Sequence, residues 1–581
     1  MRRRMRRKAQ IVMWLVSACL LLAACSGLGA GGGSGVDVSP KPQNDTEERG
    51  HDARTGAGTP AVSREQELIF DPGRYTVSPE LMKERDKQLS WKQDTSPITF
   101  TVFYNSPLGY EYKGWGNDPI SAEIKRRTGV TLELTFATTS DNSQINTMMA
   151  SGEMTDFIIN FDRTARGNLI KQGFVEPLDK LIDLYAPSMW SVIPERQRII
   201  YTEADGHLYT LANWFGDPQM TKEVKGALRA NSGLVMNVAD WEKLGKPPLD
   251  TLDQYKQALL LAKEKLPNQR FLVYEDGQMD QFMARLHGAG HPKTIGDDGT
   301  VHMNYRDDAY LQGIKFINGL YRDGLLNPEM FSIQKDQVAQ AVANRQIFST
   351  WGYQGTTKDH GEYSEDSPYQ LMSIPQVPGI TFEWQDLTGS AGGSSAMITT
   401  SNKNKERAIR FLEFMQSFEG QTLTYVGIEG EHYEWADGLI QRTPEIEEAR
   451  ADFTKFMQEY GMVSQINNWA ASGYVDQLGY YWSSRSGMKV YKQIEELWNG
   501  NTVDEFINSA LTVQAGSPEQ VIEAKITDLH KQAKMKMYLA KSEQEAEIEY
   551  RAFIAEAEKI GLAQLEAAYT TRYQQLKAMG F

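Results

Sequence analysis

Residues 98–104, ITFTVFY, begin the part of the chain that decides the fold. This apolar, β-branched stretch predicts a buried strand. The alternation in residues 130–136, VTLELTF, predicts a second strand, and residues 156–161, DFIINF, a third. Helical patterns follow the first two strands, at 119–128 and about 142–151. A β-α-β-α-β order at this short spacing predicts a parallel, doubly wound sheet, which binds ligands outside the carboxyl ends of its strands.

The helical patterns carry clear end signals. Asp118-Pro119 provides a capping carboxylate followed by a proline in the first turn, and Gly129 and Gly152 follow the two helices. Thr251 with Gln254 forms a capping-box pattern before a long helix that extends to about Lys265. These signals support an α/β protein.

Length and composition bound the class of protein. The chain has 581 residues, which suggests roughly two to four domains. A formal net charge of −15 and a pI near 5.2 argue against binding to nucleic acid. Two cysteines cannot build a disulfide framework or a four-cysteine zinc site. We assign no metal ligands and expect no cofactor, and the sequence leaves a structural calcium open.

The first 24 residues read as a secretory signal. Six basic residues precede an apolar stretch from Ile11 to Ala24, which is too short to span a membrane. The stretch ends in Leu22-Ala-Ala-Cys25, which resembles a bacterial lipobox. That resemblance predicts acylation of Cys25 and anchoring at the outer face of the membrane of a Gram-positive cell. A plain secretory signal with an accidental cysteine is the alternative, and Cys19 lies in the segment to be removed.

A low-complexity stretch separates the signal from the globular pattern. Residues 25–66 are rich in Gly, Ser and Pro and predict a flexible tether. Residues 67–96 are expected to be a partly ordered segment that leads into the globular body, and residues 501–581 a set of helices packed on it.

Nine short stretches, in the same order, resemble one family. That family is the extracellular solute-binding proteins of carbohydrate ABC transporters (family 1 type), and within it the LipO- and LplA-like lipoproteins. The stretches are Trp115–Pro119, Glu123–Val130, Met149–Asp156, Gly173–Asp179, Asp205–Tyr209, Met236–Gly245, Thr251–Tyr255, Gly427–Tyr433 and Ala540–Glu543. Each is weak alone, but together they cover nearly all of 97–575.

The resemblance implies a two-lobed, periplasmic-binding-protein-like fold of type II, with hinge crossovers and a helical C-terminal tail. We expect one lobe to hold 97–215 and 350–393, and the other 216–349 and 394–500. The implied function is non-enzymatic capture of an oligosaccharide by hinge closure. The implied partners are two permease subunits and the ATPase reached through them, with the protein itself a monomer.

Candidate ligand contacts are aromatic rings and polar groups at turns. Rings can cover the C–H faces of a sugar, while amides, carboxylates and guanidinium groups bind its hydroxyls. The candidates are Asn105, Trp115, Asp162, Arg163, Trp214, Trp351, Tyr353, Trp384 and Trp469. Each tryptophan could instead belong to a core, and Asp162-Arg163 could be only a solvated turn.

Other classes of function stay open at this stage. Glu429, Glu431 and Glu434 could supply the paired carboxylates of a surface hydrolase or lyase, although their spacing is unspecific. A sensory lipoprotein or a peptide binder is also compatible with the sequence. His287 and His291 have metal-like spacing, but the glycines between them favour a structural role.

Overall fold

The computed structural model describes one compact unit of the chain, which lies within Val62–Phe581. The described residues are 78–108, 110–139, 141–159, 162–221, 232–266, 273–274, 279–290, 292–331, 335–353, 368–386, 393, 396–436, 438–450, 452–463, 469, 473–480, 497 and 502–581. The predicted signal and tether lie outside these residues. None of the described helices combines the length and the hydropathy needed to cross a membrane.

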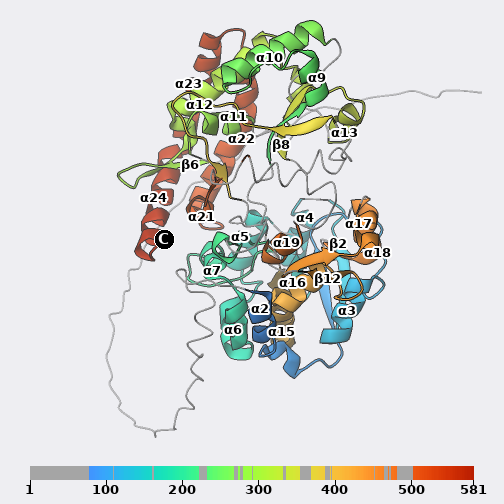
Figure 1. Ribbon diagram of the computed structural model, residues 1–581. Coiled ribbons are helices and arrows are strands. Elements are labelled where there is room, and N and C mark those ends of the chain that lie inside the picture. The colour runs from blue at the N-terminus through green and yellow to red at the C-terminus, as the bar shows by residue number, and fades with distance from the viewer. Residues whose placement is uncertain are drawn as a thin grey trace, which may run out of the picture. The chain divides into compact units, whose positions relative to one another are not determined.

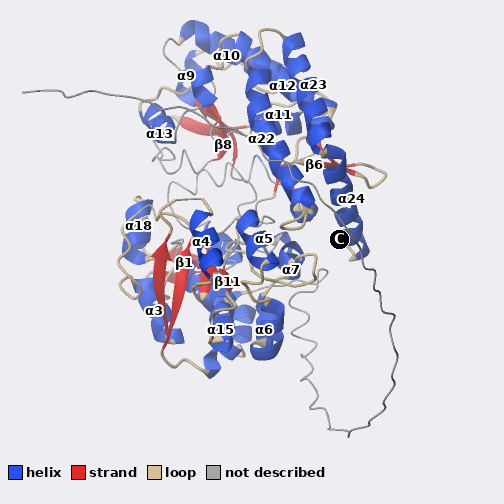
Figure 2. Cartoon of the chain, turned by 180° about the vertical axis from the view of Figure 1, so that it is seen from behind, coloured by secondary structure: helices blue, strands red, loops and turns tan. Residues whose placement is uncertain are grey.

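The first lobe is built on a four-stranded sheet in the order β11-β3-β1-β2. Strand β1 (Ile98–Tyr104) is parallel to β2 (Val130–Phe136) and to β3 (Phe157–Ile159), whereas β11 (Ala396–Ile398) is antiparallel to β3. Helices α3 (Pro119–Thr128), α4 (Ser143–Ser151) and α5 (Arg163–Lys171) complete the expected β-α-β-α-β order (Figure 2).

Local sequence explains where these helices begin and end. The carboxylate of Asp118 accepts a hydrogen bond from Ser121 N at 2.8 Å, and Pro119 occupies the first helical turn of α3. Gly129, with φ +73°, ends α3, and a Cβ there would lie 2.1 Å from Thr95 O. The helix therefore stops where the chain must turn into β2.

The second lobe has its own four-stranded sheet, in the order β5-β8-β4-β9. Strand β4 (Ser232–Asn237) is antiparallel to β8 (Ser349–Tyr353) and β9 (Tyr369–Met372), and β5 (Val273–Tyr274) is parallel to β8. The predicted placing of 350–393 in the first lobe is therefore wrong. So is the placing of 394–500 in the second, because β11 pairs with β3 and helix α15 (Lys405–Gln416) packs in the first lobe's core. A strand pattern is local, but its pairing partner is not.

Three long C-terminal helices complete the second lobe. They are α22 (Pro518–Tyr538), α23 (Glu543–Ile560) and α24 (Leu562–Ala578). They lie beside α10 (Leu252–Lys265), α11 (Met279–Leu286) and α12 (Asp308–Arg322) (Figure 1). Buried side chains of all these helices share one hydrophobic core with the second sheet. The predicted capping box of Thr251 and Gln254 is present at the start of α10.

The segment before the first strand is fastened to the first lobe. Helix α2 (Pro79–Asp86) and the 3-10 turn η2 (Ser90–Gln93) precede β1. Glu413 of α15 is buried and accepts hydrogen bonds from Ser90 Oγ (2.8 Å), Trp91 N (2.7 Å) and Ser188 Oγ (2.5 Å).

The remaining elements are α6 (Leu178–Tyr185), η3 (Pro187–Val192), α7 (Glu195–Tyr201), α8 (Pro218–Thr221), α9 (Val238–Lys243), β6 (Lys293–Ile295), β7 (Val301–Met303), η4 (Asn304–Arg306), η5 (Pro328–Phe331), α13 (Lys335–Ala343), β10 (Trp384–Gln385), α16 (Phe418–Tyr425), β12 (Tyr433–Ala436), β13 (Leu439–Arg442), α17 (Pro444–Ala449), α18 (Phe453–Tyr460), α19 (Gly473–Tyr480), β14 (Thr502–Val503) and α21 (Phe506–Ala510).

Candidate functional site

Three polar side chains form a hydrogen-bonded chain at the carboxyl ends of the parallel strands. Asn105 follows β1, Asn142 precedes α4 after β2, and Asp162 follows β3. Asn105 Nδ2 donates to Asn142 Oδ1 at 3.0 Å, and Asn142 Nδ2 donates to Asp162 Oδ2 at 2.9 Å. We call Asn105, Asn142 and Asp162 the relay. It lies where a parallel sheet of this kind is expected to bind a ligand.

The other oxygen of Asp162 has a structural task. Asp162 is the N-cap of α5, and its Oδ1 accepts from Ala165 N at 2.7 Å. One carboxylate thus fixes both the start of a helix and one end of the relay. Asn142 was not predicted as a site residue, although an Asn directly before a helix that follows a strand is a usable signal for this position.

Aromatic rings lie at the same end of the sheet. The Tyr112 ring packs edge-to-face on Phe136, the last residue of β2, with centroids 5.3 Å apart, and Tyr104 packs on Phe136 at 5.7 Å. The Tyr112 hydroxyl is buried and has no hydrogen-bond partner among the described residues. Burial raises the pKa of Tyr112 well above its usual range, so the hydroxyl stays protonated and able to donate.

Arg163 points to a different partner from the one expected. Its Nη1 lies 3.0 Å from Glu523 Oε2 on α22, and its Nη2 donates to Val513 O. The guanidinium therefore joins the first turn of α5 to the C-terminal segment. Its proposed contact with a sugar hydroxyl stays a hypothesis, because part of its hydrogen-bonding capacity is already used.

Two predicted tryptophans lie in hydrophobic cores, which corrects their assignment, and a third lies away from the relay. Trp351 is 0% exposed, and its Nε1 donates to Tyr255 OH at 3.0 Å inside the second lobe's core. Trp469 is 1% exposed and packs on Phe157 in the first lobe's core. Trp115 Nε1 donates to Val130 O at 3.1 Å, at the amino end of β2. At about 3.3 Å per residue, that point is roughly 20 Å from the carboxyl end.

The other candidates lie near the crossovers between the lobes or beyond what is described. Trp214 is half-buried, and its neighbour Asn213 donates from its backbone N–H to Gly393 O at 2.9 Å, which ties two crossover segments together. Tyr353 and Trp384 have described backbones, in β8 and β10, but their side chains lie outside the described residues.

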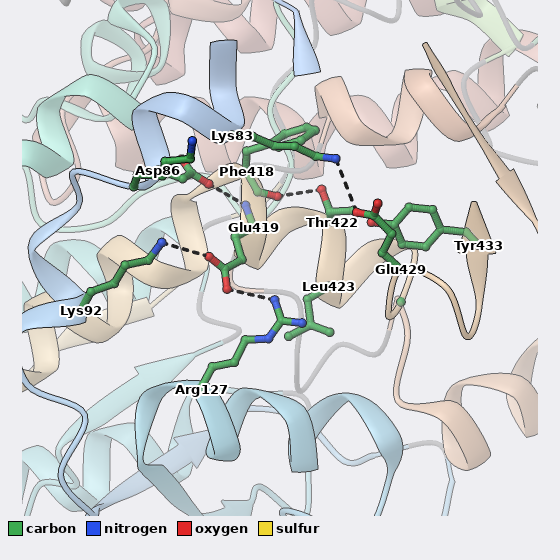
Figure 3. Close-up of a pocket in the computed structure, with 12 residues that line it drawn as sticks. Lys83, Asp86, Lys92, Arg127, Phe418, Glu419, Thr422, Leu423, Glu429 and Tyr433 are labelled. Carbon is green, nitrogen blue, oxygen red and sulfur yellow. Dashed lines mark hydrogen bonds and ion pairs between the residues drawn. The ribbon is translucent and has the colours of Figure 1, made fainter. Parts of the chain in front are cut away.

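A pocket of about 290 Å³ opens elsewhere in the first lobe, beside α2 and α16 (Figure 3). Glu419 is at its centre and pairs with Lys92 at 3.4 Å and with Arg127 at 2.9 Å. The backbone N–H of Glu419 donates to Asp86 Oδ2 at 2.7 Å. Glu419 and Glu429 thus pair with cations of α2, η2 and α3, and these contacts hold the N-terminal segment in place.

The candidate catalytic carboxylates and metal ligands have ordinary surroundings. Glu429 pairs with Lys83 at 3.4 Å on the rim of that pocket, while Glu434 belongs to strand β12. His287 Nδ1 lies 2.7 Å from Met283 O, one helical turn away, and His291 is outside the described residues. In the described ranges, no group of three or more His, Cys, Asp or Glu side chains could hold a metal ion.

Comparison with known proteins decides the family. The family model described as "Bacterial extracellular solute-binding protein" matches residues 114–422, which is more than half of the chain. The chain belongs to this family. The family predicted from the sequence is confirmed. So is the predicted fold class, a two-lobed, type II solute-binding protein with a helical C-terminal region.

The individual relatives of this family have low sequence identity to this chain. The fructooligosaccharide ABC transporter substrate-binding protein FusA of Streptococcus pneumoniae is 23% identical over 331 residues, which cover 53% of this chain and 60% of FusA. Lipoprotein LipO of Bacillus subtilis is 24% identical over 364 residues, covering 58% of this chain and 69% of LipO. The match to FusA thus spans less than two thirds of that protein's length.

Solved structures of solute-binding proteins match over more of the chain. The alginate-binding protein AlgQ2 aligns with a TM-score of 0.61 and 19% identity, over 83% of this chain and 99% of AlgQ2. FusA in complex with kestose aligns with a TM-score of 0.62 and 17% identity, over 83% and 100%. At this level of identity the likeness establishes the fold and leaves the ligand open.

Proposed function

We propose that this protein is the substrate-binding component of an ABC importer, and that it captures an oligosaccharide and delivers it to the permease. Membership of the solute-binding family supports this role, as does similarity to FusA, whose name assigns it to fructooligosaccharides. The polar relay at the carboxyl edge of the first sheet is the observation that carries the proposal.

The relay has the chemistry that a sugar needs. A hydroxyl both donates and accepts, and planar amides held in a fixed direction can distinguish the positions of hydroxyls around a ring. Asn105 is 5% exposed, and Asn142 and Asp162 are held by the hydrogen bonds of the relay, so these groups are ordered before a ligand arrives. Such preorganisation lowers the entropic cost of binding.

Capture would proceed by closure of the two lobes. A ligand that contacts both lobes only in the closed form shifts the open–closed equilibrium by its difference in affinity for the two forms. The closed form would then dock on two permease subunits driven by an ATPase. The protein would act as a monomer and perform no chemistry on the ligand.

The anchor is a separate part of the proposal. We propose that Cys25 carries lipid after removal of residues 1–24, and that residues 25–66 tether the body to the outer face of the cell membrane. Similarity to LipO, which is named a lipoprotein, supports this assignment.

Calorimetric titration would test the capture role. The mature chain, residues 25–581 with Cys25→Ser so that no lipid is attached, would be titrated with neutral and uronic oligosaccharides, and each mixture then checked for cleavage. Binding of an intact ligand supports the importer role. A cleaved ligand would establish an enzyme instead, and binding of peptides alone would redirect the proposal to peptide capture.

A further inference from the structure

The direction of every hydrogen bond in the relay follows from its end group. The carboxylate of Asp162 can only accept, so Asn142 must present its Nδ2 to it. Asn142 Oδ1 is then the atom that faces Asn105, which must donate from its own Nδ2. The remaining atom of the Asn105 amide, Oδ1, is therefore an acceptor.

That acceptor is buried and unsatisfied. Asn105 Oδ1 has no hydrogen-bond partner among the described residues, in a side chain that is 5% exposed. A buried polar atom without a partner costs about 1–3 kcal/mol, so a ligand group that donates to it gains that energy. A hydroxyl can donate a hydrogen bond, whereas an ionised carboxylate cannot.

The positive charge nearest in sequence to the relay is already balanced. Arg163 pairs with Glu523 at 3.0 Å and donates to Val513 O, while its Nε is buried without a partner among the described residues. Arg163 can therefore still donate hydrogen bonds to a ligand, but its positive charge is already compensated by Glu523.

The groups around Glu523 include a second cation, Lys293, which contacts an aromatic ring. Tyr569 OH donates to Glu523 Oε1 at 2.5 Å. Lys293 is 9% exposed, and its Nζ lies 4.8 Å from the centre of the Tyr569 ring. A ligand carboxylate at the relay would thus lie beside the Asp162 carboxylate, while Arg163 is already engaged by Glu523 and Lys293 by the Tyr569 ring, so its burial is costly in a desolvated site.

We infer that the relay selects a neutral, hydroxyl-rich carbohydrate over a uronic one. This inference rests on the proposed function. The fold leaves the matter open, since its solved neighbours include both an alginate-binding protein and a kestose complex. The net charge of −15 acts in the same direction, because it repels polyanions at long range.

The test compares neutral and uronic oligosaccharides of equal length on the mature Cys25→Ser chain. We expect a neutral ligand to bind at least tenfold more tightly than its uronic counterpart, with an affinity that changes less than twofold between 50 and about 300 mM salt. Tighter binding of the uronic ligand would overturn the inference and leave the importer role intact. Failure of both to bind would remove the proposed function and this inference with it.

A charge-neutralising variant tests the cause. Glu523→Gln keeps an acceptor for Arg163 but removes the balancing charge, so the uronic ligand should gain at least fivefold while the neutral ligand stays within twofold. Glu519→Gln is the matched control, because Glu519 lies in the first turn of the same helix and bonds to Gln564. A Glu523→Gln variant that folds normally but shows unchanged uronic affinity would contradict the role given to Arg163.

Discussion

Asn105 Nδ2 lies 3.0 Å from Asn142 Oδ1, and this contact joins the carboxyl end of β1 to the start of α4. We predict that Asn142→Ala weakens ligand binding about tenfold. The loss corresponds to about 1.4 kcal/mol, as expected when a hydrogen-bonded amide is removed and its buried partner is left unpaired. Calorimetry with the best ligand of the panel measures the change.

Asn117→Ala is the control for this variant. Asn117 lies later in the loop after β1, is exposed, and bonds to Lys113 O. Its loss should leave the affinity within twofold. If Asn142→Ala bound as tightly as the unaltered chain, the relay could not be the ligand site.

The sequence predicts the parts of this site that depend on local order. The strand patterns and the Asp162 position after the third strand were enough to place a carboxylate at the carboxyl edge of the sheet. The pairing of Arg163 with Glu523 joins residues far apart in the chain, and no local pattern specifies it. The predicted assignment of strands to lobes was wrong for the same reason, because β8 pairs with β4 and β11 with β3, and nothing within these short strands specifies the partner.

The tryptophans show a second limit. Trp351 is flanked by Thr350 and Gly352, which is typical of an exposed turn, yet strand β8 carries it into a core beside Tyr255 and Phe282. Burial of a large ring depends on which elements cover its strand. Which elements cover a strand is a property of the tertiary structure, and the residues next to the ring in sequence do not specify it.

Trp351→Ala should therefore act on stability. We predict a loss of about 3–5 kcal/mol, because the change empties a packed site and leaves Tyr255 OH without the indole donor. Urea unfolding measures it. Trp190→Ala, at a half-buried ring that bonds to Asp183, should cost much less. Unchanged stability with weakened ligand binding would return Trp351 to the ligand site.

The lipid anchor gives a sharp comparison between two cysteines. We predict that Cys25→Ser abolishes incorporation of labelled palmitate and releases the protein from the membrane fraction, since the thiol is the atom to which the diacylglyceryl group is attached. Cys19→Ser should change neither readout, because Cys19 lies in the apolar segment that is removed. Retained label in Cys25→Ser would contradict the lipobox assignment.

A buried carboxylate in the second lobe predicts how stability depends on pH. Asp280, 1% exposed, lies 2.9 Å from His530 Nε2 and accepts from Tyr310 OH at 2.8 Å and Tyr538 OH at 2.9 Å. Burial alone would raise the pKa of Asp280, but the hydrogen bond and charge of His530 outweigh it and lower the pKa to about 2. This group fastens α22 to α11 and α12.

Because the folded pKa is below the value of 3.8 in the unfolded chain, Asp280 stabilises the fold fully above about pH 4. The contribution is lost as pH falls from about 4 through about 2. Asp280→Asn should cost about 3 kcal/mol at pH 7, because it removes the buried negative charge that faces His530 and replaces one accepting oxygen by a donor. The difference between Asp280→Asn and the unaltered chain should shrink as pH falls through that range. Urea unfolding at several pH values measures it, with Asp253→Asn at an exposed helix start as the control. A difference that stays constant down to pH 2 would show that Asp280 does not carry this charge in the folded protein.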